Sequence, residues 1–381
     1  MTDAGSQGPA AAGTAKPALF VAYPQLAERI RHVSLGEFPT AIERIPGPLP
    51  GGFELWVKRE DLAGRRYGGN KVRKLEFLLA AAQQQRAHWL LTLGGFGSNH
   101  VLATAIYGGA LGMRVAAVLF PQPLVEPARP YVRHNLLAGV AAGLQPQICR
   151  SYAGLAWAFP RAYLRLRSAA RADGGNLRYI CGGGSNGIGT LGWWSGGLEI
   201  AQQIAAGLAP RFDAVYVALG SGGTTAGLRL GLGSACQELV AVRVVPWPLS
   251  TQAAVQRLSG QALQQVARAL GLRFSLAAFP SLRIDPRFLG GGYGHGTAAA
   301  QQAQAQAADL GLRLDPTYTA KAFAALWADA KAGRLRGKRV LFVHTYNGRA
   351  PVGGDDARGL QALPAWLASQ LDLGSDATRG G

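Results

Sequence analysis

Short apolar runs alternate with segments of helical periodicity through the middle of the chain. An apolar run bounded by turn residues indicates a buried strand, whereas apolar positions three and four residues apart indicate one face of a helix. These patterns predict strands at residues 53–58, 89–93, 114–120, 177–181, 214–219 and 340–345. They predict helices at residues 70–85, 98–111 and 225–232.

The order of these elements predicts the fold class. Strand, glycine turn and helix recur along the chain, which is typical of right-handed βαβ units built on parallel sheets. We therefore expect an α/β protein with doubly wound parallel sheets. Ligands of such sheets bind where the carboxyl ends of strands meet the N-termini of helices. We therefore expect the binding and catalytic residues in the glycine turns at those places.

The composition fits this fold and narrows the class of protein. The chain has 381 residues, of which 48% are hydrophobic and 16% charged, and this predicts an ordered protein of two domains. No apolar run approaches the roughly 18–20 residues needed to cross a bilayer, so we expect no membrane partner. Residues 1–18 and 371–381 are small and polar and are expected to be flexible tails.

Cysteine and charge bear on the compartment and the partners. Cys149, Cys181 and Cys236 are unclustered, which predicts neither a disulfide framework nor a zinc site and favours a reducing, cytoplasmic location. The net charge is +18, from 39 Lys and Arg against 21 Asp and Glu. However, the arginines are scattered and we find no basic helix or RNA-binding motif, so no specific nucleic-acid partner is expected. The six histidines show no H-x-x-x-H spacing, so no metal site is expected.

The first glycine turn, Gly68-Gly69-Asn70-Lys71, stands at the start of a predicted helix. A glycine pair permits tight backbone geometry and the close approach of a ligand. The positive end of the helix dipole disfavours a charged ammonium, so Lys71 is a candidate nucleophilic amine. The plain alternative is a solvated surface lysine.

The second glycine turn, residues 220–227 (GSGGTTAG), directly follows a predicted strand. Its successive N–H groups, the dipole of the next helix and the hydroxyls of Ser221, Thr224 and Thr225 predict an anion cradle. The turn lacks GK[ST], so it is not the nucleotide P-loop.

The third glycine turn, residues 94–100 (GGFGSNH), again joins a strand to a helix. Its N–H groups and the side chains of Ser98, Asn99 and His100 suit a carboxylate. The same residues would also serve simply as a helix cap, and the sequence favours neither interpretation.

Residues 182–187 (GGGSNG) match two other motifs. G-x-G-x-x-G suggests dinucleotide binding, but no acidic residue follows at the distance that ribose recognition requires. G-x-S-x-G suggests a serine hydrolase with Ser185 as nucleophile and His295 or His344 as partner. A segment with this many glycines can match both motifs by chance. We keep two alternatives from other functional classes, the serine hydrolase and a basic, non-catalytic binding protein.

Taken together and in this order, the Asn-Lys helix start, the Ser-Asn-His loop and the GSGGTTAG turn resemble the fold-type II enzymes that use pyridoxal 5′-phosphate (PLP). Within that group, KRED…GGNKVRKLE followed by GSNH resembles the D-cysteine desulfhydrase and 1-aminocyclopropane-1-carboxylate (ACC) deaminase family. The similarity extends from Phe38-Pro39-Thr40 to Gly292-Tyr293-Gly294, residues 315–319 (DPTYT) and His344-Thr345, thus over about residues 33–350. The order of several separate motifs is far more specific than any one of them.

The resemblance implies which residues bind the cofactor. Lys71 would be the Schiff-base lysine and would move the proton at the substrate Cα, and Asn70 would lie near the phenolic oxygen of the cofactor. Thr345 would contact the pyridine nitrogen and give a weaker electron sink than an aspartate. The cofactor phosphate would be held by Gly220, Ser221, Gly222, Gly223 and Thr224. Because PLP delocalises the negative charge that develops at Cα, the protein has to supply a base, a carboxylate site and a phosphate site.

The resemblance also implies a substrate and a reaction. Ser98, Asn99 and His100 would receive the carboxylate of a small amino acid, with Ser98 a candidate proton carrier. Tyr293, Tyr318 and Thr319 would face the substrate. The implied reaction is α,β-elimination, most directly of D-cysteine to pyruvate, ammonia and hydrogen sulfide. ACC deaminases have an acidic residue at the position of Thr319, whereas this chain has a threonine there, as the desulfhydrases do. ACC deamination is therefore kept as the alternative.

Two departures from the family pattern bear on the pocket. Tyr346-Asn347 stand where Gly-Gly is common, and the bulky pair Trp193-Trp194 follows residues 182–187. Either could narrow the pocket, although the tryptophans fit a core or interface position better.

The resemblance finally implies an architecture, the tryptophan synthase β-like PLP fold. A large domain would comprise residues 19–73 plus 186–370, and a small domain residues 74–185. The active site would lie in the cleft between them. A homodimer is implied in the same way.

Overall fold

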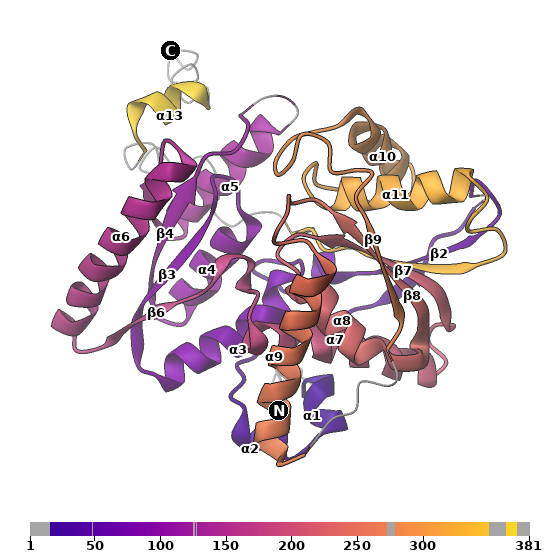
Figure 1. Cartoon of the computed structure of the whole chain (residues 1–381), viewed down its shortest axis with the longest axis horizontal. Helices are drawn as coiled ribbons and strands as arrows, with labels where there is room; N and C mark the ends of the chain where they lie inside the picture. The colour runs from indigo at the N-terminus through magenta and orange to yellow at the C-terminus, as the bar shows by residue number, and fades with distance from the viewer. Residues whose placement is uncertain are drawn as a thin grey trace, which may run out of the picture.

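Two sheets lie side by side in the computed structural model, which describes residues 16–47, 49–124, 126, 128–272, 279–349 and 363–371 (Figure 1). In this described part of the chain, the large sheet has the strand order β1-β2-β10-β7-β8-β9. Its strands are β1 (Ile42–Arg44), β2 (Glu54–Lys58), β7 (Phe212–Leu219), β8 (Cys236–Arg243), β9 (Ser281–Asp285) and β10 (Arg339–Val343). Neighbouring strands pair parallel, except that β1 pairs antiparallel with β2.

The small sheet has the order β5-β4-β3-β6, and its neighbouring strands pair parallel. Its strands are β3 (Ala87–Gly95), β4 (Arg114–Phe120), β5 (Gln145–Ile148) and β6 (Asn176–Tyr179). The chain runs from β3 outward to β5 and then returns to β6 on the other side of β3. The large sheet reverses in the same way between β7 and β10. Each sheet therefore has a switch point, where the carboxyl ends of two strands leave a crevice for a ligand.

Helices cover both faces of the large sheet. Ala214, Tyr216 and Ala218 of β7 pack in one cluster with α10 (Ala298–Ala308) and α11 (Thr319–Lys331). The alternate residues Val215 and Val217 pack in another cluster with α7 (Gly187–Ala205) and α8 (Gly223–Leu232), as expected from the two-residue period of a strand. The helices α9 (Gln252–Leu270), α1 (Ala18–Ala22) and α2 (Leu26–Arg29) pack outside α7 and α8.

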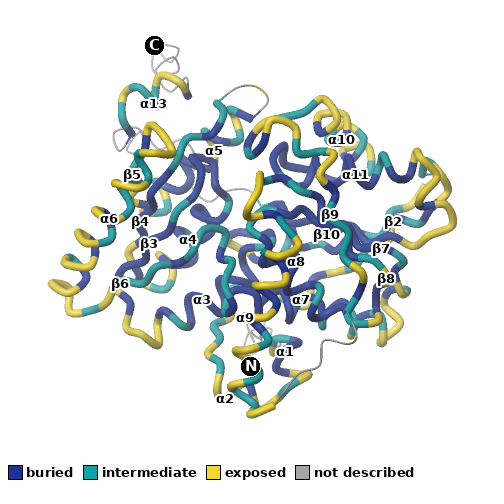
Figure 2. The backbone as a smooth tube through the Cα atoms, in the orientation of Figure 1, coloured by how far each residue is buried: buried dark blue, intermediate teal, exposed yellow. Residues whose placement is uncertain are grey.

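The small sheet is covered in the same manner. Leu90 of β3 packs with α3 (Lys71–Gln84), α4 (Asn99–Ala110) and α5 (Arg129–Ala141) on one face. Its neighbours Trp89 and Leu91 pack with α6 (Tyr152–Ala172) on the other. The outer surface of α6 is largely exposed, whereas the inner strands β3 and β4 are mostly buried (Figure 2). The described residues also form short 3-10 helices, η1 (Glu60–Leu62), η2 (Gly182–Gly184) and η3 (Gly233–Ala235).

The predicted α/β class with two doubly wound parallel sheets is confirmed. β4 has the predicted bounds, and the other predicted strands and helices differ from the observed ones by one or two residues at their ends. The antiparallel edge strand β1 was not predicted, because a strand of three residues is too short to show a periodic pattern.

Two helices depart from the expected division into domains. α3 runs without a break across the expected boundary at residue 73. α13 (Ala365–Gln370), which we expected in the large domain, packs on the small-sheet cluster through Leu363, Leu367 and Leu371. Of the expected tails, residues 1–15 and 372–381 lie outside the described residues, while α1 already begins at Ala18 and Leu371 is buried.

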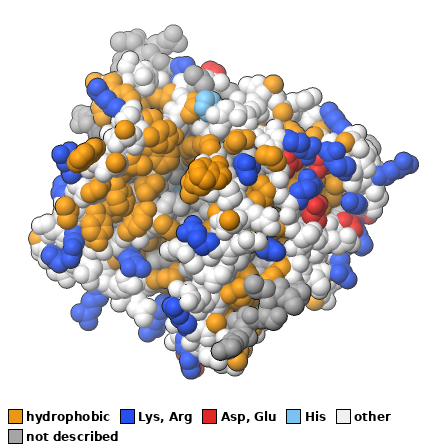
Figure 3. Space-filling view, viewed as in Figure 1, with side chains coloured by type: hydrophobic (Ala, Val, Ile, Leu, Met, Phe, Trp, Pro, Cys, Tyr) orange, Lys and Arg blue, Asp and Glu red, His pale blue; other side chains and the backbone are white. Residues whose placement is uncertain are grey.

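The surface is basic and mixed in character. Within the described ranges, no helix has the length and apolar character needed to cross a membrane. Lys and Arg side chains are scattered over the face shown in Figure 3, and hydrophobic side chains gather on the part formed by the small sheet and α6.

Candidate active site

A cavity of about 880 Å³ opens where the switch points of the two sheets meet. It brings together candidates from all three glycine turns and from the late motifs. Those that line it are Asn70, Lys71, Ser98, Asn99, His100, Gly220, Ser221, Gly222, Thr224, Tyr293, Tyr318 and Thr345. The candidates Gly223 and Thr319 are not among the lining residues.

The glycine pair brings the start of α3 against the end of β10. Gly69 has a φ of +82°, which a residue with a side chain rarely adopts. A Cβ atom at Gly69 would lie 2.8 Å from the carbonyl oxygen of Thr345. The N–H of Asn70 donates a hydrogen bond of 3.1 Å to the same carbonyl. Lys71 and Thr345 are therefore held on one side of the cavity by backbone contacts.

Lys71 is the first residue of α3, and only 8% of its surface is exposed. Burial lowers the pKa of its ammonium from 10.5 to about 8, although the negative charge of Asp315 opposes the shift. Its Nζ lies 5.9 Å from the centre of the Tyr318 ring. The neutral share of Lys71 near physiological pH is therefore much greater than for an ordinary lysine, and a nucleophile and a base require this neutral form.

The 220–227 turn lies beside this amine. The side-chain Nδ2 of Asn70 donates to Thr224 Oγ1 at 3.0 Å, and Trp193 Nε1 donates to the Asn70 carbonyl at 2.8 Å. Gly222, with a φ of +88°, is the N-cap of α8. The first N–H groups of this helix, which has ten residues, have no carbonyl partner within the helix and start on the side of the cavity that Gly220 and Gly222 line.

Hydroxyl groups and a second lysine complete the anion-binding end. Ser185 Oγ lies 2.7 Å from Ser221 Oγ and accepts from the N–H of Gly223 at 3.1 Å. Lys74 Nζ donates to Ser185 Oγ at 3.1 Å and to the Gly183 carbonyl at 3.0 Å. Burial, with the neighbouring charge of Lys71, places the pKa of Lys74 well below its ordinary value. A bound anion here would reverse this effect and favour the ammonium form.

Sequence reasoning did not select Lys74 or assign Ser185 to this end of the site. A signal for Lys74 was present, because residues three apart lie on the same face of a helix. Ser185 was singled out only as a hydrolase nucleophile. Among the described residues it forms hydrogen bonds with Lys74, Ser221, Gly183 and Gly223, and none of these is a histidine.

The histidines proposed as partners of Ser185 are placed differently. His344 Nε2 contacts the Arg313 carbonyl at 2.9 Å, and its Nδ1 lies 3.3 Å from Asp61 Oδ1. His295 lines the cavity beside Gly291, without a hydrogen bond to Ser185 among the described contacts. The geometry therefore does not support the serine hydrolase alternative.

The Ser-Asn-His loop forms the start of α4. Ser98 is its N-cap, with Oγ accepting from the N–H of Val101 at 3.4 Å. His100 is buried, and its Nε2 lies 3.1 Å from Thr92 Oγ1. Burial and the nearby positive charges of Lys71 and Lys74 place the pKa of His100 well below its ordinary value, so it is neutral. The loop thus offers polar groups without a fixed charge.

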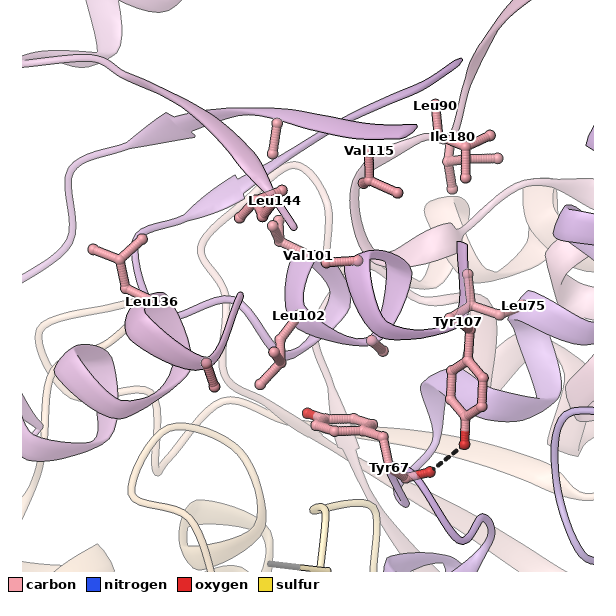
Figure 4. Packing of buried hydrophobic residues seen from close by; sticks show 14 of the residues in the cluster. Tyr67, Leu75, Leu90, Val101, Leu102, Tyr107, Val115, Leu136, Leu144 and Ile180 are labelled. Carbon is pink, nitrogen blue, oxygen red and sulfur yellow. Dashed lines mark hydrogen bonds between the residues drawn. The ribbon is translucent and has the colours of Figure 1, made fainter. Parts of the chain in front are cut away.

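Asn99 is oriented by its neighbours. Its Oδ1 accepts from the Tyr67 hydroxyl at 3.1 Å and from Asn135 Nδ2 at 2.9 Å. Asn135 Nδ2 also donates to the Gly97 carbonyl at 2.9 Å. Tyr67 in turn lies beneath α4, where its carbonyl accepts from the Tyr107 hydroxyl (Figure 4). With its oxygen engaged twice, Asn99 presents its Nδ2 donor as the free end of the amide.

Tyr318 and Tyr293 lie together, with a distance of 3.3 Å between their hydroxyl oxygens. Asp315, which sequence reasoning quoted only as part of a motif, lines the cavity and accepts from the N–H of Tyr318 at 2.7 Å. Thr319 was expected to face the substrate, but its hydroxyl donates to Asp315 Oδ2 at 2.7 Å behind the cavity wall. The Thr319 side chain therefore contacts Asp315, where we had expected it to contact the substrate.

The departures from the family pattern do not narrow the cavity. Trp193 and Trp194 are buried in the hydrophobic core, which agrees with the core or interface position preferred from the sequence. Tyr346 and Asn347 are not among the lining residues, and Asn347 Oδ1 accepts from the N–H of Gly68 at 2.6 Å. In the described part of the chain, no three His, Cys, Asp or Glu residues gather as a metal site would require.

The glycine turn fits a phosphate group. A Cβ atom at Gly223 would lie 2.7 Å from Ser185 Oγ, and one at Gly183 would lie 2.1 Å from Ser221 Oγ. Only glycines therefore let these backbone segments and hydroxyls converge. A helix N-terminus, three hydroxyls and the Lys74 ammonium are the donors that a phosphate dianion needs.

The fold and the site together fit an enzyme that binds a phosphate-bearing cofactor beside a buried lysine. The chain belongs to the pyridoxal-phosphate dependent enzyme family, whose model matches residues 33–345. PLP is thus its cofactor, as the sequence predicted.

Named relatives support the narrower resemblance. The chain is 35% identical over 322 residues to a D-cysteine desulfhydrase of Salmonella paratyphi A, covering 82% of this chain and 92% of that protein. It is 33% identical over 324 residues to a mitochondrial bifunctional D-cysteine desulfhydrase/ACC deaminase of Arabidopsis thaliana, covering 82% and 77%. A crystal structure of an ACC deaminase homologue superposes with a TM-score of 0.70 at 28% identity, covering 92% of this chain and all of that one.

Proposed function

We propose that this PLP-dependent lyase eliminates the β-substituent of a small D-amino acid, with D-cysteine giving pyruvate, ammonia and hydrogen sulfide. The observation that carries the proposal is the convergence, in one cavity, of the Lys71 amine, the anion-binding turn and the Ser98–Asn99 loop. The activity named for the Salmonella relative supports the choice of D-cysteine.

The cofactor end of the site follows from the donors described above. Lys71 would hold PLP covalently, with Asn70 near its phenolic oxygen and Thr345 at its pyridine nitrogen. The phosphate would lie against Gly222, Gly223 and Ser221, with Ser185 and Lys74 on its other side. When bound, PLP withdraws electrons from the substrate Cα.

The substrate end would bind the carboxylate and move the proton. Asn99 Nδ2 and the N–H groups at the start of α4 would receive the carboxylate, with Ser98 Oγ beside them. The amine of Lys71, released as the substrate takes its place, would remove the proton from Cα, because burial lowers its pKa to about 8 and so raises the share of neutral amine. Tyr318 and Tyr293 would face the leaving group. Because the pyridine nitrogen would contact a threonine, the negative charge at Cα would be delocalised less into the ring. Expulsion of the β-substituent would then be favoured.

ACC deamination is the second candidate function, and the bifunctional Arabidopsis relative favours keeping it. Thr319 argues for desulfhydration, since a buried threonine hydroxyl bonded to Asp315 cannot act as the acid found there in ACC deaminases. Sulfide release from D-cysteine compared with 2-oxobutyrate release from ACC separates the two. We expect D-cysteine to be preferred and both activities to vanish in Lys71→Ala; a preference for ACC would reverse the assignment.

We also propose a homodimer in a reducing, cytoplasmic compartment. The three cysteines are free, which suits such a compartment. The dimer follows from the family resemblance alone. Light scattering coupled to size exclusion should give a mass near twice 39.9 kDa, and a monomeric mass would refute it.

A further inference from the structure

A series of aromatic rings leads from the reactive amine to the surface. Lys71 Nζ lies 5.9 Å from the Tyr318 ring centre, and the Tyr318 and Tyr293 centres are 6.0 Å apart. The Tyr293 and Phe120 centres are 6.4 Å apart, and those of Phe120 and Tyr152 are 5.3 Å apart. All four aromatic residues line the cavity, and Tyr152 is 62% exposed. We call Tyr318, Tyr293, Phe120 and Tyr152 the aromatic row.

A second apolar segment adjoins this row. Residues 245–249 (VPWPL) follow β8 and line the cavity, and within them Trp247 is 77% and Leu249 is 52% exposed. Pro246 Cγ would lie 3.5 Å from a Cβ atom at Gly292, the neighbour of Tyr293. Large apolar side chains gathered at the wall of a cavity indicate a binding surface, because water contact is unfavourable for them.

The cavity offers more apolar surface than D-cysteine can cover. Its volume of about 880 Å³ has to hold the cofactor and a substrate, and the thiol of cysteine has no group to lay against rings that reach the surface. A ring or long alkyl group on the sulfur would extend from Cβ past Tyr318 and Tyr293 toward Phe120 and Trp247. Burial of such a group against aromatic faces is favourable both through the area removed from water and through ring–ring contact.

We propose that the preferred substrates are S-substituted D-cysteines with an aromatic or bulky apolar group on sulfur. This inference rests on the proposed elimination. The step breaks the Cβ–S bond, the sulfur leaves with the bonding pair as a thiolate, and the proton comes off Cα. One water then converts the enamine product to pyruvate and ammonia, and the thiolate takes up a proton, so no oxidant or reductant is needed.

An anionic substituent is the competing substrate class, because Arg257 also lines the cavity. Arg257 is an exposed residue of α9, and its neighbour Leu258 would lie 3.1 Å from a Cβ atom at Gly222. Arg257 therefore belongs to the side of the glycine turn, where the cofactor phosphate would bind. This placement favours the apolar class for the substituent.

The test compares four substrates of the holoenzyme by pyruvate release: D-cysteine and its S-methyl, S-benzyl and S-carboxymethyl derivatives. We expect kcat/KM for the S-benzyl compound to exceed that for the S-methyl compound by about tenfold or more. S-carboxymethyl preference, or equal rates for benzyl and methyl, would overturn this inference while leaving the elimination intact. Absence of turnover with all four by the PLP-loaded enzyme would overturn both.

Single substitutions in the cavity wall show which residues produce the preference for the benzyl group. Trp247→Ala and Phe120→Ala should each lower the benzyl-to-methyl ratio of kcat/KM by about tenfold, since each removes a ring from the wall. Trp247 is exposed, so its removal leaves the core intact. Trp157→Ala is the matched control, because Trp157 is a 71% exposed tryptophan of α6 that does not line the cavity. An unchanged ratio in the first two variants, or an equal fall in Trp157→Ala, would contradict the proposal.

Discussion

Asn70 Nδ2 donates a hydrogen bond of 3.0 Å to Thr224 Oγ1 across 154 positions of the sequence. α3 begins one residue after Asn70, and Thr224 lies in the first turn of α8. The bond therefore links the start of α3, which carries Lys71, to the glycine turn that we propose binds the cofactor phosphate. One small molecule can reach Lys71 and the turn only while they are held close together.

Asn70→Ala should weaken PLP binding about tenfold, because it removes this bond and leaves Thr224 without its donor. Titration of the apoenzyme with PLP, followed by absorbance, measures the change. Asn176→Ala is the control, since Asn176 also donates a side-chain hydrogen bond, to the Gln85 carbonyl, but lies away from the cavity. Wild-type affinity in Asn70→Ala would mean that the bond has no part in holding the cofactor.

Lys74→Met should separate recognition of the phosphate from recognition of the rest of the cofactor. A charged hydrogen bond contributes about 1.5–3 kcal/mol, so the affinity for PLP should fall by roughly 10–100-fold. The affinity for pyridoxal, which lacks the phosphate, should change by less than about threefold, within the range of a lost neutral contact. Equal losses for the two compounds would show that Lys74 does not act on the phosphate.

The stability of the apoenzyme should depend on pH through Lys71. Its pKa of about 8 in the folded protein lies below the ordinary 10.5, so between these values the unfolded chain binds one more proton. Stability from this group is therefore lowest below pH 8 and rises between pH 8 and 10.5. Lys71→Met removes the penalty and should stabilise the apoenzyme by about 3 kcal/mol at pH 7, less as the pH approaches 10.5. Urea unfolding measures both proteins, and a difference that does not vary with pH would refute the assignment.

Asn135→Ala tests how Asn99 is oriented. Without Asn135 Nδ2, Asn99 Oδ1 keeps only the Tyr67 hydroxyl, and its amide becomes free to turn. We expect KM for D-cysteine to rise about tenfold, the cost of one hydrogen bond, while PLP affinity stays that of the wild type. Asn135→Asp retains an oxygen in the place of the donor and should not restore KM. If kcat and PLP affinity fell together with KM unchanged, the role would be structural.

The sequence predicted the parts of this site that depend on local pattern. The glycine turns at residues 94–100 and 220–227 each follow an apolar run and precede a helix, so both could be placed at strand ends without a structure. Lys74 was missed because its value depends on Ser185, which comes 111 positions later. The hydrogen bond of Thr319 to Asp315 was not predicted, because a motif shows that a residue is near the site, but not which way its side chain turns.

The edges of the fold were harder to predict for a different reason. β1 has three residues, and α13 packs on the small sheet although it follows the large-sheet strands in the sequence. Both depend on long-range contacts that no local pattern encodes. The same holds for Asn135, which becomes part of the site only because α5 packs against α4.

The most direct test of the central claim is to locate the covalent bond to the cofactor. The purified holoenzyme is reduced with sodium borohydride, digested and sequenced by tandem mass spectrometry, which distinguishes Lys71 from Lys74 three residues away. We predict a single reduced pyridoxyl-phosphate group on Lys71 and none on Lys71→Ala. A modification on Lys74 or any other lysine, or an unmodified Lys71 in a protein that carries PLP, would contradict the account.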